Sequence, residues 1–341
     1  MKAAVFYGVN DIRIEAHAMP VVGKTDVLIK VKACGVCGTD VHIFHGDKGA
    51  ADVNPPTILG HEFSGIAVEI GSDVKGIKVG DRVAVDPNKY CGQCEPCRNG
   101  LVHFCKHMIG YGTTANGGFA EYCAVDESQL YKLGDGTDYL AGAMTEPLAC
   151  CIHGIDMCGI KPGTQVLVIG AGMIGLLMMQ LAKICGASKV AVIELADEKR
   201  RQAKSLGADL VIDPASQDPE EILEKNGFGH IDTVIECVGK VQTINQAINL
   251  AGYKATVMMF GLTAPDDILQ LKPFDVFRKE LTLKASYINP CTCGRALDLI
   301  NMKRIDVSSM VAEVCSLEKL PQILSDPTIR SRGKYIISPE I

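Results

Sequence analysis

The chain has 341 residues, of which 47% are hydrophobic and 22% charged, and its formal net charge is −6 at pH 7. This length exceeds what one ordinary core holds and predicts two domains. The negative charge argues against a nucleic-acid partner, because no basic field is present to attract a phosphate backbone. The start of the chain lacks the apolar segment of a secretory signal, so we expect a cytoplasmic protein with no membrane partner.

Short apolar runs alternate with Gly, Pro and Asp through the first part of the chain. This pattern is typical of short strands joined by turns, and it predicts a compact, barrel-like, β-rich first domain. The expected strands lie at residues 3–7, 12–16, 26–33, 63–70, 81–85 and 119–125.

Two loops of this first domain carry a candidate catalytic metal site. Cys37 lies in the segment GVCGTDVH, and His61 and Glu62 lie in GHEF. A thiolate, an imidazole and a carboxylate are ligand types that zinc takes in an open catalytic site. In a regular strand the side chains of His61 and Glu62 face opposite ways. Both reach one metal only if the backbone is irregular there, or if one acts through water. Taken singly, a Cys is more often a small buried apolar residue, and a His a hydrogen-bonded polar one.

A second candidate metal site is formed by cysteines alone, with the spacing C-x₂-C-x₂-C-x₇-C. Such short gaps let one irregular loop wrap a tetrahedral ion, and a shell of four thiolates is closed, which predicts a structural zinc. An iron–sulfur cluster uses similar spacing, but nothing else in the chain indicates electron transfer. The total of 15 cysteines is odd, and without an export signal a disulfide framework is not expected. The four residues are Cys91, Cys94, Cys97 and Cys105.

A glycine-rich turn indicates a dinucleotide site in the second half. An apolar run at 166–169 is followed by GAGMIG, with Gly170, Gly172 and Gly175 in the G-x-G-x-x-G spacing and Ile174 between them. A helical run at 176–184 follows, so strand, turn and helix come in the order that binds a pyrophosphate. A second strand at 189–194 ends in Glu194, near the roughly 20-residue spacing expected for a ribose-binding carboxylate. A strand-to-helix turn with no ligand is the alternative.

Strands and helices then alternate to about residue 286. Further strands are expected at 209–212, 231–236, 255–260 and 281–286, and helices at 198–206, 219–226 and 243–250. Six strands with intervening helices predict an α/β domain with a doubly wound parallel sheet. Past Tyr287 the chain is expected to return to the first domain, with a helix at 295–302 and a final strand at 334–338.

The GHE segment, the four-cysteine lobe and the later GAGMIG, in this order, resemble the zinc-containing medium-chain alcohol and polyol dehydrogenases. The resemblance covers essentially the whole chain. It implies a GroES-like catalytic domain at 1–150 and 287–341, with a structural zinc lobe at about 88–107, and a Rossmann domain at 151–286. Glu146-Pro147-Leu148 is similar to the polyol branch, which includes sorbitol dehydrogenase. We expect Pro147 to hold Glu146 in extended backbone, with its carboxylate toward the metal. A loop charge with no metal role is the alternative for Glu146.

The resemblance implies a reaction, oxidation of a secondary alcohol to a ketone with hydride passing to NAD. It implies zinc held by Cys37 and His61, with Glu62 and Glu146 as direct or water-mediated partners. Thr39 is then a proton-relay hydroxyl and His42 the exit to solvent, or else a plain surface histidine. Glu194 favours NAD over NADP by repelling a 2′-phosphate. Lys199 matches a basic position near the ribose in sorbitol dehydrogenases.

The substrate is expected to be a small polyol or diol, and the assembly a homo-oligomer, with the family suggesting a tetramer. Sorbitol dehydrogenases carry an arginine before an aromatic residue near Tyr287, whereas this chain has Ser286 there. The difference leaves other free or phosphorylated polyols, butanediol-type diols and threonine open as substrates. A non-catalytic, NAD-binding zinc protein is an alternative of a different class.

Overall fold

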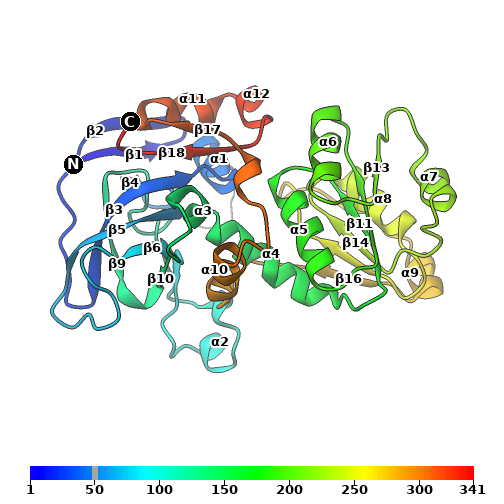
Figure 1. The fold of residues 1–341 in the computed structure, drawn as a ribbon, viewed down its shortest axis with the longest axis horizontal. Helices are drawn as coiled ribbons and strands as arrows, with labels where there is room; N and C mark the ends of the chain where they lie inside the picture. Colours follow the sequence, from blue (N-terminus) through cyan, green and yellow to red (C-terminus); the bar gives the residue numbers. More distant parts are fainter. Residues whose placement is uncertain (48–52) are drawn as a thin grey trace. The chain divides into compact units, whose positions relative to one another are not determined.

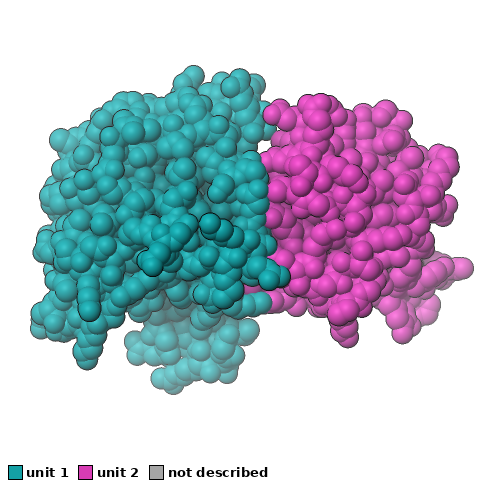
Figure 2. All heavy atoms as spheres, viewed as in Figure 1, with its two compact units in different colours: residues 1–149, 289–341 teal, residues 150–288 magenta. Residues whose placement is uncertain are grey.

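The computed structural model describes residues 1–47 and 53–341. Contacts divide the chain into two compact units, Met1–Ala149 with Asn289–Ile341, and Cys150–Ile288 (Figure 2). The first unit is therefore assembled from two separate stretches of sequence, between which the second is inserted. Among the described residues, no helix is both long and apolar enough to cross a membrane.

The first unit is rich in β-structure, as its alternating apolar runs predict (Figure 1). Its largest sheet contains β3 (Asp26–Gly35), β5 (Glu62–Ile70), β6 (Arg82–Val85), β9 (Tyr122–Asp126), β10 (Leu130–Lys132), β17 (Val311–Cys315) and β18 (Lys334–Ile337). The strand order is β10-β6-β5-β3-β18-β17, and β9 also pairs with β3. β1 (Lys2–Gly8), β2 (Asp11–Ala16) and β4 (Thr57–Ile58) form a smaller sheet, and β7 (Asn88–Lys89) pairs with β8 (Ile109–Gly110).

Apolar side chains from these strands and from neighbouring loops and helices form the main core of this unit, with Phe63, Phe119, Ile29, Ile58 and Leu59 fully buried. The register across its centre matters for the site. Gly35 on β3 lies opposite Glu62 on β5 and opposite Ile336 on β18, so the ends of these three strands meet.

Short helices complete the first unit. They are α1 (Gly38–His45), α2 (Glu95–Arg98), α3 (Tyr139–Ala143), α10 (Cys293–Asn301), α11 (Leu320–Ser325) and α12 (Pro327–Arg330), with 3₁₀ turns η1 (Val102–Phe104), η2 (Glu127–Gln129), η3 (Ser308–Met310) and η4 (Leu317–Lys319).

The helix α4 (Thr145–Cys158) carries the chain into the second unit and corrects one prediction. Glu146 was expected in extended backbone before Pro147, but both lie in the first turn of α4. That expectation is wrong because the first N–H groups of a helix have no intrahelical acceptor. Proline therefore fits there without breaking the helix or forcing its neighbour out of it.

The second unit is an α/β domain whose strands are all parallel. They are β11 (Gln165–Ile169), β12 (Lys189–Ile193), β13 (Leu210–Ile212), β14 (Thr233–Glu236), β15 (Thr256–Met259) and β16 (Thr282–Ala285), in the order β13-β12-β11-β14-β15-β16. The helices are α5 (Met173–Ile184), α6 (Asp197–Ser205), α7 (Pro219–Lys225), α8 (Val241–Leu250) and α9 (Pro273–Lys279). This strand order is that of a doubly wound, dinucleotide-binding sheet, which confirms the predicted fold class.

The order of the sheet also locates its functional edge. The chain crosses from one side of β11 to the other, so β11 and β14 flank the point where the strand order reverses. Ligands of such sheets bind beyond the carboxyl ends of the strands at this point. The glycine turn after Ile169 lies at that edge.

Candidate functional site

Ligand atoms of Cys37, His61 and Glu62 lie within 4.8 Å of one another. Cys37 immediately precedes α1, His61 precedes β5, and Glu62 is the first residue of that strand. A thiolate, an imidazole and a carboxylate at this spacing can surround one divalent cation, and zinc accepts all three ligand types.

Gly60 provides the irregular backbone that lets adjacent residues share a site. Its φ is +90°, a conformation that residues with a side chain rarely adopt. A Cβ at this position would lie 2.7 Å from the sulfur of Cys34 and 2.8 Å from the ring of Phe119. The turn at Gly60 therefore leaves His61 outside the regular strand, so the alternation of a pleat does not apply to His61 and Glu62.

Asp40 links the two loops of the cluster. Its side chain is fully buried, and its Oδ2 accepts a 2.8 Å hydrogen bond from the backbone N–H of Cys37. Its Oδ1 lies 3.5 Å from Nδ1 of His61. A carboxylate on one ring nitrogen orients the other nitrogen toward a metal, as is common for zinc-binding histidines. Burial alone lowers the pKa of His61, but Asp40 and Cys37 reverse this and raise the pKa well above its usual value.

Lys334 is the cationic neighbour of the cluster. Its ammonium forms an ion pair with Oε2 of Glu62, and the two side chains are only 4% and 1% exposed. Burial lowers the pKa of Lys334, but Glu62 and Cys37 more than offset this, so the pKa is raised. No local sequence pattern marks Lys334, because it reaches the site only through the pairing of β18 with β3.

The other predicted catalytic residues lie on α1 and α4. Thr39 is half-buried in the first turn of α1, and His42 lies one turn further along. Nδ1 of His42 is 3.2 Å from Oδ2 of Asp47, and its side chain is 40% exposed. Glu146 is buried in the first turn of α4. Among the described residues, it is not one of those whose ligand atoms meet with Cys37, His61 and Glu62.

The four cysteines of the lobe form a second cluster with the geometry of a single-ion site. Their sulfurs all lie within 4.8 Å of one another, and those of Cys94 and Cys105 are 3.8 Å apart. A tetrahedral ion with Zn–S distances of about 2.3 Å places its sulfurs about 3.8 Å apart. Backbone N–H groups of Cys97 and Lys106 lower the pKa of Cys94 to about 6, which favours its thiolate. These cysteines therefore fit one zinc ion.

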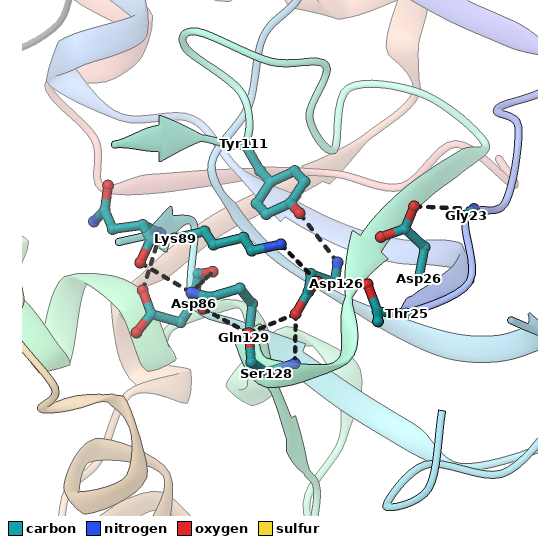
Figure 3. Close-up of polar contacts among 10 residues, drawn as sticks. Gly23, Thr25, Asp26, Asp86, Lys89, Tyr111, Asp126, Ser128 and Gln129 are labelled. Atoms are coloured by element: carbon teal, nitrogen blue, oxygen red, sulfur yellow. Dashed lines mark hydrogen bonds and ion pairs between the residues drawn. The ribbon is translucent and has the colours of Figure 1, made fainter. Parts of the chain in front are cut away.

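A polar network anchors the base of this lobe (Figure 3). The Asp126 carboxylate accepts hydrogen bonds from Lys89 at 2.6 Å, from Thr25 at 2.9 Å and from the hydroxyl and backbone N–H of Ser128. Burial alone raises the pKa of Asp126, but these donors lower it to about 2. Because Lys89 belongs to β7, which leads directly into Cys91, the network holds the strand from which the lobe begins.

The glycine turn in the second unit forms an open cradle. Gly170 has φ +96°, and a Cβ on Gly175 would overlap the carbonyl oxygen of Gly170. By contrast, a Cβ on Gly172, the N-cap of α5, would meet nothing within 4 Å. The N-terminus of a helix with free space before it fits a pyrophosphate, because unpaired N–H groups and the helix dipole both favour an anion. Ile174 lies half-buried in the first turn of α5.

Glu194 lies beside this cradle, just beyond the end of β12. Its two carboxylate oxygens accept hydrogen bonds from the backbone N–H groups of Ala171, at 2.8 Å, and Ala196, at 2.9 Å. The carboxylate is thereby fixed against the glycine turn. Since the residue is half-buried, part of it remains open to solvent.

The basic residues that follow Glu194 have different surroundings. Arg200 donates to the backbone carbonyls of Glu194 and Leu195 and lies 3.5 Å from Asp213. Arg201 forms an ion pair with Asp197 at 2.7 Å. Lys199 is half-buried on the same helix. The guanidinium of Arg200 therefore supports the turn that carries Glu194.

Comparisons with known proteins cover nearly the whole chain. Residues 23–135 match the alcohol dehydrogenase GroES-like domain, and residues 174–302 match the zinc-binding dehydrogenase model. A sorbitol dehydrogenase of Halalkalibacterium halodurans is 37% identical over 318 residues, which are 91% of this chain and 91% of the relative.

Two solved structures show the same fold along their whole length. A zinc-binding dehydrogenase from Sinorhizobium meliloti 1021, bound to NADP, is 39% identical with a TM-score of 0.95, covering 99% of both chains. The 2R,3R-butanediol dehydrogenase from Bacillus subtilis is 31% identical with a TM-score of 0.89, again covering 99% of both chains.

Proposed function

Because the chain belongs to the zinc-binding medium-chain alcohol dehydrogenase family, we propose that it oxidises a secondary alcohol of a polyol to a ketone. In this oxidation the carbon gives up a hydride to NAD, and the hydroxyl gives up a proton that passes to solvent. The observation that carries the proposal is the meeting of Cys37, His61 and Glu62, in a chain that also has an open glycine cradle.

The catalytic zinc would be held by Cys37 and His61, with Glu62 and Glu146 as direct or water-mediated partners. Zinc supplies a Lewis acid that lowers the pKa of the substrate alcohol. Asp40 orients the His61 ring through the carboxylate oxygen that lies 3.5 Å from Nδ1, and it fixes the Cys37 loop by accepting a hydrogen bond from the backbone N–H of Cys37. The two ligand loops are thereby held in place by one buried carboxylate.

Thr39 and His42 provide a route for the alcohol proton. They are three residues apart on α1 and therefore lie on one face of this helix. The Thr39 hydroxyl would take the proton and pass it toward His42, whose side chain is exposed to solvent. Such a route matters because a buried alcohol must lose its proton before its hydride leaves.

The second unit would hold the dinucleotide. Gly172 and the N-terminus of α5 offer the pyrophosphate a cradle, Gly170 and Gly175 shape the turn, and Ile174 lies in the first helical turn. The nicotinamide supplies the hydride acceptor.

We propose a preference for NAD over NADP. The Glu194 carboxylate would accept hydrogen bonds from the ribose and repel a 2′-phosphate. Arg200 is committed to backbone carbonyls and to Asp213, which leaves Lys199 on the same helix as a candidate basic side chain for a phosphate. The NADP-bound relative from Sinorhizobium meliloti makes a kinetic comparison of the two cofactors necessary.

Two zinc ions per chain follow from the two clusters, one catalytic and one structural in the lobe.

The similarity to a sorbitol dehydrogenase supports a polyol substrate, whereas Ser286 at the position of an expected arginine argues against sorbitol itself. A butanediol-type diol is the second candidate, supported by the full-length likeness to butanediol dehydrogenase. We also propose a homo-oligomer, either a tetramer or a dimer.

The direct test is a dehydrogenase screen of polyols, diols and amino alcohols with NAD and with NADP, together with the zinc content per chain. We expect reduction of NAD by at least one polyol and two zinc ions per chain. One zinc ion and no turnover of any alcohol would instead favour a non-catalytic, NAD-binding zinc protein.

A further inference from the structure

Lys334 and Glu62 form a buried ion pair next to the candidate catalytic metal. The two side chains are 4% and 1% exposed, so water screens neither charge. Of the three candidate ligand residues, Glu62 is the one whose carboxylate forms an ion pair with a lysine. Removing one partner of such a pair leaves an uncompensated buried charge, which is strongly destabilising.

The local packing makes room for this pair. Gly35 lies between the strands that carry the two residues, opposite Glu62 on one side and Ile336 on the other. A Cβ on Gly35 would overlap both Oε2 of Glu62 and Cε of Lys334. The absence of a side chain at Gly35 is therefore what allows the Glu62 carboxylate and the Lys334 ammonium to meet across β3.

The groups around the ion pair favour the charged form of Lys334. Glu62, Cys37 and Asp40 each stabilise the charged form of Lys334. Of these three, Glu62 forms the ion pair with it. In the metal-free protein Lys334 is the cation paired with Glu62, and a bound divalent cation would add its charge beside the same carboxylate. The ammonium and the metal also attract the same carboxylate.

We propose that Lys334 is a positioning residue of the catalytic metal centre, where it competes with the metal for the Glu62 carboxylate and stabilises the metal-free pocket. This inference rests on the proposed function, since it requires a metal at Cys37, His61 and Glu62. It predicts that loss of the ammonium weakens the metal-free protein more than the metal-bound one. By linkage, the metal then binds more tightly.

The test measures zinc affinity of the full-length chain by competition with a chromophoric chelator. The zinc that Cys37→Ala eliminates defines the catalytic site, and the lobe zinc is the internal reference. Lys334→Met keeps a long apolar stem and removes the charge. We expect it to tighten catalytic-site zinc by about tenfold or more, since the metal then no longer competes with an ammonium for the Glu62 carboxylate. It should leave the lobe zinc unchanged.

Glu62→Gln provides the second arm of a double-mutant cycle. In that background Lys334→Met should change zinc affinity by less than about twofold, because the shared carboxylate is gone. Lys32→Met is a matched control, since Lys32 lies on the neighbouring strand and pairs with Glu340 at the surface. It should leave both zinc affinities unchanged.

Hydrogen exchange of β5 gives a readout independent of activity. Lys334→Met should speed exchange in the metal-free protein and have little effect with metal bound. The double variant Glu62→Gln/Lys334→Met should restore the slow exchange, because both buried charges are removed together. If Lys334→Met folds only with zinc and the double variant folds without it, the proposal is supported. If neither folds without zinc, Lys334 has a purely structural role and the proposal is overturned.

The outcomes also separate this inference from the proposed function. Weaker zinc binding in Lys334→Met, or an equal change in both Glu62 backgrounds, overturns the role of Lys334 alone. A wild-type chain that binds zinc only in the lobe overturns both.

Discussion

Gly60→Ala tests the backbone geometry that lets His61 and Glu62 share one metal. The added Cβ meets the sulfur of Cys34 at 2.7 Å and the ring of Phe119 at 2.8 Å, in a residue with φ +90°. The strained φ costs about 1–3 kcal/mol and the overpacking about another 1–3 kcal/mol, so we expect a loss of about 2–6 kcal/mol. Relief of this strain requires the chain to shift at the two ligands, so the catalytic zinc should be lost as well.

Gly38→Ala is the matched control, because Gly38 adjoins the ligand Cys37 as Gly60 adjoins His61. A Cβ on Gly38 would meet nothing within 4 Å. Alanine favours the helix that begins there by up to about 1 kcal/mol, so stability should be equal or higher. Zinc content and hydrogen exchange of β5 compare the two variants. A Gly60→Ala protein with two zinc ions and unchanged exchange of β5 would refute the reasoning.

Three further predictions concern the anchor, the cofactor and the relay. Asp126→Asn should lower the free energy of unfolding at pH 7 by up to about 2 kcal/mol, because the folded pKa of Asp126 is about 2. That contribution is present above the unfolded pKa and fades as the pH falls from about 5 to 2. The difference in free energy of unfolding between wild type and variant should therefore roughly halve by pH 3. A difference that does not depend on pH contradicts the role of the carboxylate charge. Glu194→Ala should shift the ratio of kcat/KM for NAD and NADP toward NADP by about tenfold or more, since hydrogen bonds to a charged group are worth about 1.5–3 kcal/mol; an unchanged ratio means that Glu194 does not select the cofactor. His42→Gln should lower kcat/KM by about ten- to a hundredfold near neutral pH, with partial rescue by added imidazole; full activity without rescue would assign His42 to the surface alone.

The second unit could be predicted in most respects from the sequence, because local patterns determine it. Buried parallel strands read as continuous apolar runs, and the glycine turn marks the junction of β11 and α5. The helix α9 was missed because its aromatic residues do not form a buried stripe. Phe274 and Phe277 are 65% and 78% exposed.

The site was less predictable where it depends on contacts between distant segments. The spacing of the lobe cysteines specifies a local loop, so their clustering follows from the sequence alone. Lys334 could not be found in this way, since only the register of β18 with β3 brings it to Glu62. The predicted extended backbone at Glu146 is wrong because the rule that disfavours helix before proline does not hold in a first helical turn.

Anomalous scattering at the zinc absorption edge from crystals of the zinc-loaded chain tests the central claim most directly. We expect two peaks per chain, one among the ligand atoms of Cys37, His61 and Glu62, and one among the four lobe sulfurs. A single peak in the lobe, with the other three residues free of metal, would contradict a zinc-dependent alcohol dehydrogenase.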